Sequence, residues 1–295
     1  MPAAVSPSVR RRRLAIELRQ LREGVPGKRT VSEVGKALGW SPSKVSRYEL
    51  GQGGLNPDEV TKLLDYYRVT DPKRGQLLAL ARDAAQKGWW EDYADAISEQ
   101  YQEFIGLEAE ATSIWQYQIE VLPGLLQTEE YARQVILGYR AAASIPPGVA
   151  ERRIQVRMIR QQALTRDPPL ELSVVLDEST LLRKIGDRSV MYAQLQRLAE
   201  AAEAPNVTIQ VLPLNSDCSL VAASFAILRF GPEGPEGETM LHDVVSTESL
   251  REEFYLEDDA VTYEHWLAFR GLSAESMDPA ESRKQILKLA KQVWA

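Results

Sequence analysis

The sequence predicts an all-α N-terminal domain followed by a larger α+β domain with a helical front part. Helix-start signals and helical spacing of apolar residues recur through residues 9–84, whereas apolar residues begin to alternate after Pro169. A chain of 295 residues with 44% hydrophobic residues is long enough to bury two cores. We therefore place the two domains at 9–84 and 86–295.

Capping residues and apolar spacing predict the outer helices of the N-terminal domain. Leu14, Leu18 and Leu21 lie on one helical face of a first helix. Asn56 and Asp71 each stand directly before a proline, and we expect them to begin a fourth and a fifth helix. Proline suits the first helical position because its missing N–H would have no partner there.

The stretch that begins at Thr30 predicts two short helices joined by a tight turn. Thr30 can cap the first helix, and Gly39 can form the turn, since a residue without a Cβ adopts the left-handed conformation at low cost. Ser41 caps the second helix, whose Val45 and Tyr48 point into the core. This layout is that of a helix-turn-helix, whose second helix reads the major groove of DNA.

Charge is unevenly distributed along the chain. Residues 1–50 carry eleven Lys and Arg against four acidic residues, a local charge of +7, and the remaining 245 residues carry −14. A basic segment attached to an acidic protein is typical of a domain that meets phosphates. For Arg10–Arg13 alone, a solvated helix start is the alternative interpretation.

Polar and basic residues around the second helix of the motif are the candidates for DNA contact. We expect Arg47 to read sequence, because a guanidinium binds O6 and N7 of guanine bidentately. Lys44 is expected on phosphate. For both residues the alternative is a solvated surface side chain. The full set is Arg29, Thr30, Ser41, Ser43, Lys44, Ser46 and Arg47.

The apolar core positions of the motif are Val34, Leu38 and Val45. With these residues, segment 9–84 resembles the Xre/Cro-type (phage-repressor-like) helix-turn-helix family. The resemblance implies that Arg22 pairs with Glu49 and braces the first helix against the recognition helix. This chain has Pro42 and Ser43 where that family often has Gln, so the resemblance does not imply a base preference.

Residues 86–165 are predicted to be mainly helical. The helical pattern of 86–140 is broken at 123–124, and Thr128 begins a further helix that ends at about 139. Another helix is expected from Pro146 to about 163. An aromatic cluster in this region has two interpretations, a core seam between the domains or an apolar pocket for a small molecule or a partner helix. The turn 123–128 could line the same place or serve only in packing. The candidate residues are Trp89, Trp90, Trp115, Tyr117, Leu125 and Gln127.

Residues 170–256 are predicted to contain strands, because apolar residues there alternate or form short runs. The expected strands are 170–176, 207–212, 224–230, 240–246 and 254–256. Helices are expected between the first two strands, and two closing helices are expected within 258–294. The result is an α+β domain.

A specific run, Leu122-Pro123-Gly124-Leu125-Leu126-Gln127-Thr128 followed by Tyr131-Ala132, occurs together with the segments 90–101 and 174–178. With these segments the chain resembles the large C-terminal domain of actinobacterial antitoxin-like transcriptional regulators, a group that includes the sporulation-associated WhiJ type. In this group the regulator is often encoded next to a small partner protein. The resemblance implies control by such a partner and supplies no ligand.

Residues that commonly carry catalysis or bind metals are few. The one cysteine and the two histidines are Cys218, His242 and His265. They predict no metal site, and the chain shows no cofactor motif. The acidic pairs at 177–178 and 258–259 are interpreted as helix-start carboxylates, which favour the helix dipole. We expect no catalytic residues; a Ser/Lys self-cleaving protease and an enzyme with a DNA-targeting domain are the weaker alternatives.

Together these patterns predict a cytoplasmic, homodimeric transcriptional regulator that binds a double-stranded DNA operator. Its DNA binding is expected to be controlled in an antitoxin-like manner, by a small partner protein acting through the C-terminal domain. The alternative is a one-component regulator gated by a small-molecule effector. No apolar run approaches the roughly 20 residues of a membrane span, so no membrane partner is expected.

Overall fold

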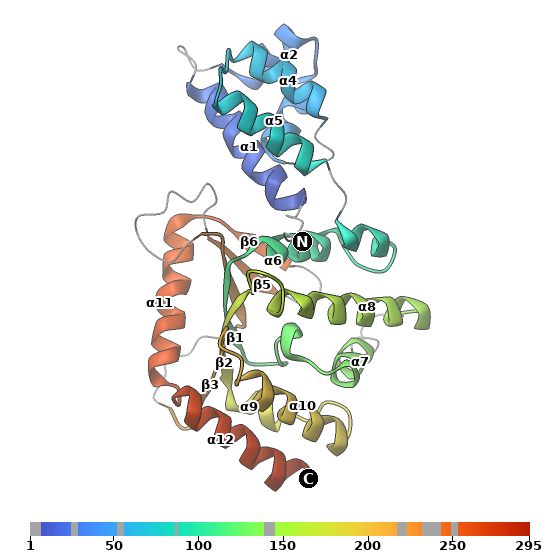
Figure 1. Cartoon of the computed structure of the whole chain (residues 1–295), viewed down its shortest axis with the longest axis vertical. Helices are drawn as coiled ribbons and strands as arrows, with labels where there is room; N and C mark the ends of the chain where they lie inside the picture. Colours follow the sequence, from blue (N-terminus) through green and yellow to red (C-terminus); the bar gives the residue numbers. More distant parts are fainter. Residues whose placement is uncertain are drawn as a thin grey trace. The chain divides into compact units, whose positions relative to one another are not determined.

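The computed structural model describes residues 7–24, 29–51, 56–85, 88–138, 145–216, 223–231, 243–248 and 253–295. The chain divides into two compact units, Met1–Glu91 and Asp92–Ala295 (Figure 1). The first unit is helical, and the second combines helices with a mixed sheet, so the predicted fold class is confirmed. Cys218 and His242 lie outside the described residues.

In the described part of the first unit, five α-helices surround one apolar core. They are α1 (Pro7–Gly24), α2 (Val31–Leu38), α3 (Pro42–Glu49), α4 (Pro57–Tyr66) and α5 (Lys73–Ala84), and the short 3₁₀ helix η1 (Trp89–Tyr93) follows them. Leu14, Leu18, Val45 and Leu63 are almost fully buried in this core. The Asn56 side chain accepts a hydrogen bond from the Asp58 amide (2.9 Å), which confirms it as the cap of α4.

The second unit is built on a six-stranded mixed sheet. Its strands are β1 (Ser113–Gln118), β2 (Glu171–Asp177), β3 (Val207–Leu212), β4 (Phe225–Arg229), β5 (Val244–Glu248) and β6 (Glu253–Leu256), arranged in the order β3-β2-β1-β4-β5-β6. The first three strands run parallel to one another, whereas β1–β4, β4–β5 and β5–β6 are antiparallel pairs. Parallel neighbours require crossover connections, and helices supply them here.

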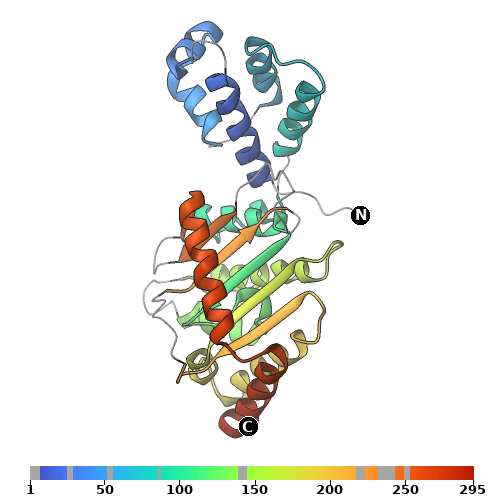
Figure 2. The same cartoon turned by 90° about the vertical axis from the view of Figure 1, so that its left-hand side faces the viewer.

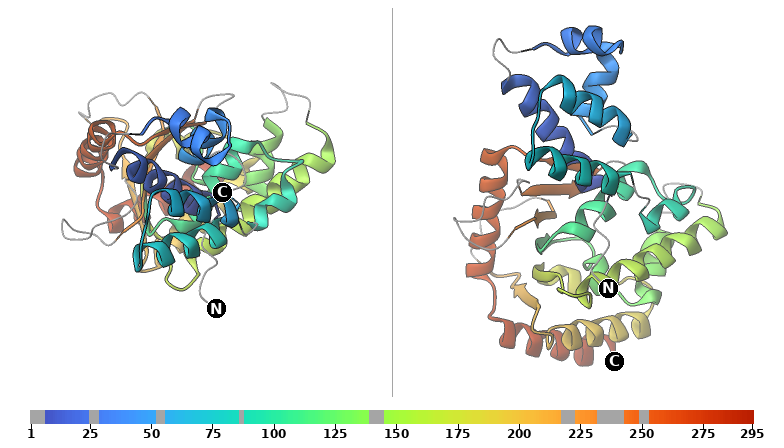
Figure 3. Two further views of the ribbon diagram at one scale, coloured as in Figure 1. Left: turned by 90° about the horizontal axis from the view of Figure 1, so that it is seen from above. Right: turned by 45° about the horizontal axis from the view of Figure 1, so that its top comes forward.

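Helices cover both faces of this sheet. The helices and short helical turns are α6 (Glu99–Glu110), η2 (Gly124–Leu126), α7 (Glu129–Gly138), α8 (Pro147–Arg160), η4 (Gln161–Leu164), α9 (Glu178–Leu182), α10 (Arg188–Ala201), α11 (Asp259–Glu275), α12 (Pro279–Leu289) and η5 (Ala290–Trp294). Helix α11 crosses one face, and α7, α8 and α10 lie on the other (Figures 1 and 2). Helix α12 lies beside α10 and β3 (Figure 3). No described helix is long and apolar enough to cross a membrane.

Strand β1 is the main correction to the predicted secondary structure, since residues 113–118 were expected to be helical. Its residues alternate between the two faces of the sheet, so Trp115 and Tyr117 both face α11. The aromatic and β-branched side chains favour a strand, and pairing with β2 and β4 fixes it. The strand expected at 240–246 is observed as β5, and residues 240–242 lie outside the described residues.

A buried ion pair joins α8 to α6 within the second unit. Arg160 Nη2 lies 2.6 Å from Glu108 Oε2, and its Nε donates to Glu108 Oε1 at 2.7 Å. The guanidinium lies beside the rings of Tyr101 and Phe104, with its centre 5.2 and 5.0 Å from the two ring centroids. Burial alone lowers the pKa of Arg160, but the negative charge of Glu108 raises it overall, so the guanidinium stays charged.

Candidate functional site

Helices α2 and α3 of the first unit form the predicted helix-turn-helix. Thr30 Oγ1 accepts from the Glu33 amide (3.2 Å), and Glu33 Oε2 accepts from the Thr30 amide (2.8 Å), which together make a capping box. Gly39 has φ 70°, the left-handed conformation predicted for the turn. Ser41 Oγ accepts from the Lys44 amide at 3.2 Å and caps α3.

Gly35 is essential to the close approach of these two helices, and sequence reasoning missed it. It is buried inside α2, where glycine is intrinsically unfavourable. A Cβ at this position would lie 2.8 Å from the carbonyl oxygen of Trp40, which belongs to the turn. A glycine in the middle of a short, otherwise strong helical pattern was the available signal.

Arg47 and its neighbours form the open face of α3. Arg47 and Ser43 are exposed, and Ser46 is half-buried. Within the described part of the chain, Arg47 has no hydrogen-bond or ion-pair partner in the protein. Ser43 Oγ lies 3.0 Å from Ser41 Oγ, so it can orient toward either the cap or a ligand. Because the Arg47 guanidinium has no partner among the described residues, it can donate hydrogen bonds to a base edge.

Lys44 differs from Arg47 because its ammonium is already engaged. Its Nζ lies 2.6 Å from Glu59 Oε1 of α4 and 4.6 Å from the centroid of the Trp40 ring. The other oxygen of Glu59 accepts from the Tyr48 hydroxyl. The hydrogen bond from Lys44 and that from Tyr48 lower the pKa of Glu59, and burial together with Glu59 raises the pKa of Tyr48 to about 12. A phosphate contact by Lys44 thus competes with an internal ion pair.

The pairing of Arg22 with Glu49, implied by the family resemblance, is present. Arg22 Nε and Nη2 donate to the two oxygens of Glu49 at 2.7 and 2.9 Å, a bidentate arrangement between α1 and the end of α3. Arg22 Nη1 also donates to the carbonyl of Arg29 at 2.8 Å. The same guanidinium therefore positions both α3 and the residue before the cap of α2, while the Arg29 residue itself remains exposed.

The six residues considered for an effector or partner are divided among different places. Trp89 and Trp90 belong to the first unit, with ring centroids 5.8 Å apart in an edge-to-face contact. Trp115 and Tyr117 face α11 in the second unit. Leu125 belongs to η2, which contacts α8 and α10, and Gln127 accepts a hydrogen bond from Arg157 of α8 at 3.0 Å. Helices α8 and α10 lie on the face of the sheet opposite α11 (Figures 1 and 2). Of the two interpretations of the turn 123–128, the structure therefore favours the one in which the turn serves in packing.

The turn at 123–128 is instead a buried, hydrogen-bonded packing element. Gln127 is 1% exposed, and its Nε2 donates to the Leu122 carbonyl at 2.7 Å. Gln194 of α10 donates to the Leu126 carbonyl (2.8 Å) and accepts from the Thr128 amide (2.6 Å). Gln161 donates to the Gln127 carbonyl at 2.6 Å. These bonds satisfy a turn that would otherwise bury unpaired backbone groups.

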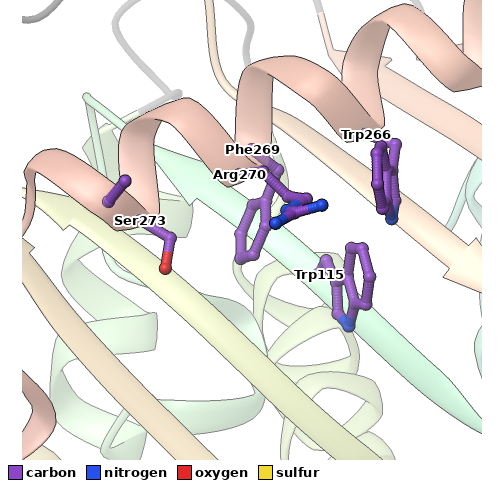
Figure 4. A pocket seen from close by; sticks show the side chains of 6 residues that line it. Trp115, Trp266, Phe269, Arg270 and Ser273 are labelled. Carbon is purple, nitrogen blue, oxygen red and sulfur yellow. The ribbon is translucent and has the colours of Figure 1, made fainter.

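Trp115 lines a pocket between α11 and the sheet, with a volume of about 390 Å³ (Figure 4). The other lining residues are Trp266, Phe269, Arg270, Ser273 and Ala274. The Trp115 ring stacks on Phe269 (centroids 5.5 Å apart) and on Trp266 (6.5 Å). Sequence reasoning missed the α11 residues because Trp115 and Trp266 are far apart in the sequence and meet only through the fold.

Helix-start carboxylates behave as expected from their position. Asp177 Oδ1 accepts from the Ser179 amide at 2.9 Å and caps α9, and Glu178 accepts from the Leu214 amide (3.2 Å). Asp258 accepts from the amides at the start of α11. In the described ranges, no three His, Cys, Asp or Glu side chains gather as a metal site would require.

The class of protein follows from the first unit together with the comparisons with known families. Residues 13–86 match the model of a helix-turn-helix domain, so the chain carries the DNA-binding domain of a helix-turn-helix regulator. Residues 101–288 match the model described as a domain of unknown function (DUF5753), and this match covers more than half of the chain. The protein therefore belongs to the DUF5753 family. Comparison with curated proteins and with solved structures gave no match.

Proposed function

We propose that the protein is a cytoplasmic, sequence-specific transcriptional regulator that binds its operator as a homodimer. The observation that carries this proposal is the open face of α3, where the free guanidinium of Arg47 stands on a helix fixed at both ends. Ser41 caps its start, and Arg22 holds Glu49 at its end. In a dimer, two such helices enter adjacent major grooves about 34 Å apart on a roughly palindromic site.

The second unit would control this DNA binding. Our first candidate is a small partner protein, as in the antitoxin-like, WhiJ-type regulators that the sequence resembles. Several large apolar side chains of the second unit are exposed and could contact such a partner, among them Leu214 (60% exposed), Tyr263 (59%) and Leu267 (48%).

A small-molecule effector is the second candidate, and the pocket beside Trp115 favours it. Its volume of about 390 Å³ falls in the range of ligand sites, which is roughly 300–1,000 Å³. We propose no catalytic role for this unit. The carboxylates Asp177, Glu178 and Asp258, which could otherwise serve as acids or bases, are engaged by backbone amides.

The test begins with DNA selection. The full-length protein is used to select binding sites from random duplexes, and the affinities of Arg47→Ala and Arg82→Ala are compared at fixed salt. Arg47→Ala should weaken operator binding by about 1–3 kcal/mol and relax specificity at one base pair. Arg82 is an exposed arginine on α5, so its removal is the matched control for loss of charge.

Two outcomes would contradict the proposal. If no sequence is enriched, the protein is not a sequence-specific regulator. If Arg47→Ala behaves like Arg82→Ala on the selected operator, Arg47 is not the reading residue. Native mass spectrometry of the protein on a selected duplex gives the stoichiometry, and one protein chain per operator would exclude the homodimer.

A further inference from the structure

We propose that the pocket between α11 and β1 binds a flat aromatic compound that carries one anionic group. The lining residues belong to the second unit alone, so the site needs no contribution from the helix-turn-helix. This proposal specifies the small-molecule effector suggested above. Ligand binding does not depend on the proposed function, whereas an effect of the ligand on DNA binding rests on it.

The walls favour an aromatic ligand. The planes of Trp115 and Phe269 are inclined by 21°, and those of Trp115 and Trp266 by 28°, so the Trp115 ring stacks on each of these two rings. Tyr263 extends the stack, with its centroid 5.7 Å from that of Trp266 and an angle of 16°. Trp115 and Trp266 are each only half-buried, which leaves part of their ring surface to a ligand. Aromatic rings add to such a stack in offset-parallel fashion.

The polar groups favour an anion, because those that remain free are donors. The indole N–H groups of Trp115 and Trp266 have no acceptor within the described part of the chain. Ser273, by contrast, is engaged, since its hydroxyl donates to Gln210 Oε1 at 2.6 Å. Indole nitrogen and guanidinium groups donate only, so a ligand must supply the acceptor.

Arg270, which is exposed, supplies a positive charge that pairs with no described residue. Its guanidinium lies beside the Trp266 ring, 4.9 Å from the centroid, and it forms no ion pair with any described residue (Figure 4). Arg229 lies over Trp115 at 4.8 Å, but Asp243 lies 3.1 Å from its Nε and neutralises it. A carboxylate or phosphate on the ligand would meet Arg270 through charge-assisted hydrogen bonds.

The pocket is open to solvent, and its size favours a small ligand. A volume of about 390 Å³ is near the lower end of ligand sites, which suits one or two fused rings with a short acidic substituent. An aromatic carboxylate and a purine mononucleotide share this chemistry, and the test separates them.

The test measures binding of defined probes to the full-length protein by ligand-observed NMR and calorimetry. The probes are 2-naphthoate, its neutral analogue 2-naphthamide, cyclohexanecarboxylate as an anion without an aromatic ring, and adenosine monophosphate. We expect saturable binding of 2-naphthoate or of the nucleotide, and at least about tenfold weaker binding of naphthamide and cyclohexanecarboxylate. The anion that binds more tightly, 2-naphthoate or adenosine monophosphate, shows whether the ligand is an aromatic carboxylate or a purine mononucleotide.

Two variants localise the binding. Arg270→Gln should weaken binding of the anion about tenfold and leave naphthamide unchanged, whereas Trp266→Leu should weaken both. Lys284→Gln, which removes an exposed charge from α12, is the matched control. Near-ultraviolet circular dichroism establishes that each variant keeps its aromatic packing, and Arg270→Gln alone decides the question if Trp266→Leu does not fold.

The proposal is overturned if none of the probes binds saturably, if naphthamide and naphthoate bind equally, or if Arg270→Gln binds like the native protein. A parallel gel-shift titration of the selected operator separates this result from the proposed function. Failure to bind DNA with intact binding of the anion contradicts the proposed function alone. Failure of the anion to bind with intact DNA binding contradicts the pocket alone.

Discussion

Each unit contains an arginine–glutamate pair that joins two helices, and the two pairs differ in their access to water. Arg22 and Glu49 connect α1 to α3 with side-chain exposures of 14% and 7%. Arg160 and Glu108 connect α8 to α6 with exposures of 7% and 4%, and the guanidinium lies beside two aromatic rings. The first pair stands beside the residues expected to meet DNA, and the second lies inside its unit.

The two arginine–glutamate pairs have different roles in the protein. Arg22 also donates to the Arg29 carbonyl, so its pair positions the elements around the DNA-binding face. Arg160 has all of its polar partners inside the second unit, including Glu108 and the Tyr101 hydroxyl. Breaking a fully buried pair leaves an uncompensated charge, whereas water can solvate part of the charge when the pair is partly exposed. The cost of breaking each pair should therefore differ, and so should its effect on DNA binding.

The largest effect is expected when Glu108 is removed. Glu108→Ala leaves the Arg160 guanidinium buried and should destabilise the second unit by about 3–5 kcal/mol. Hydrogen exchange of the full-length protein in a urea series, resolved by peptide, measures opening of α6 and α8 separately from α2 and α3. The double variant Glu108→Leu/Arg160→Met removes both charges and should lose less than Glu108→Ala. An equal or greater loss in the double variant would show that the aromatic packing, and not the charge, is what matters.

A smaller effect is expected at Glu49 in the first unit. Glu49→Ala removes the acceptor of a half-buried guanidinium and should cost the first unit about 1.5–3 kcal/mol. The same exchange experiment should show faster opening of α1 and α3, with α6 and α8 unchanged. Arg47→Ala removes a side chain that has no hydrogen-bond or ion-pair partner among the described residues, so it should leave exchange unchanged and affect DNA binding alone. If Glu49→Ala weakens DNA binding without faster exchange, Glu49 acts at the interface and not as a brace.

The helix-turn-helix could be predicted from sequence because its signals are local. Thr30, Gly39 and Ser41 each specify a helix end within a few residues, and the observed caps agree with them. The pairing of Arg22 with Glu49 was accessible only through the resemblance to a family. The engagement of Lys44 by Glu59 was not accessible, since nothing in either residue's neighbourhood indicates the other.

The second unit was less predictable because its determinants are non-local. Strand β1 is fixed by pairing with β2 and β4, at 171–177 and 225–229, and its aromatic residues resembled part of the preceding helical region. Arg160 meets Glu108 across 52 residues. The pocket needs both Trp115 and Trp266, which share no local pattern. Composition showed the aromatic residues, but only the fold shows which of them stack.

The smallest effect concerns Glu59, whose pair with Lys44 is more exposed than either arginine pair. The hydrogen bond from Lys44 lowers the pKa of Glu59, so this group stabilises the fold above its unfolded pKa of about 4.3. The stabilisation is lost as the pH falls through the lower folded pKa. Glu59→Gln should therefore reduce the loss of first-unit stability that occurs below about pH 4.5. At neutral pH it should lower the free energy of unfolding of the first unit by less than about 1 kcal/mol.

Glu59→Gln, which slightly lowers the stability of the first unit, is expected to strengthen its binding to DNA. Without Glu59, Lys44 no longer exchanges an internal partner for a phosphate, so binding to random duplexes should strengthen modestly at low salt. Asp65→Asn, which breaks the Asp65–Arg74 pair (2.7 Å) between α4 and α5, is the matched control. It should change the loss of stability at acidic pH, and the affinity for DNA, less than Glu59→Gln does. Salt-dependent gel shifts measure the effect. Unchanged affinity of Glu59→Gln, together with an unchanged affinity of Lys44→Ala, would place Lys44 outside the DNA interface and leave Arg47 as the principal cation of α3.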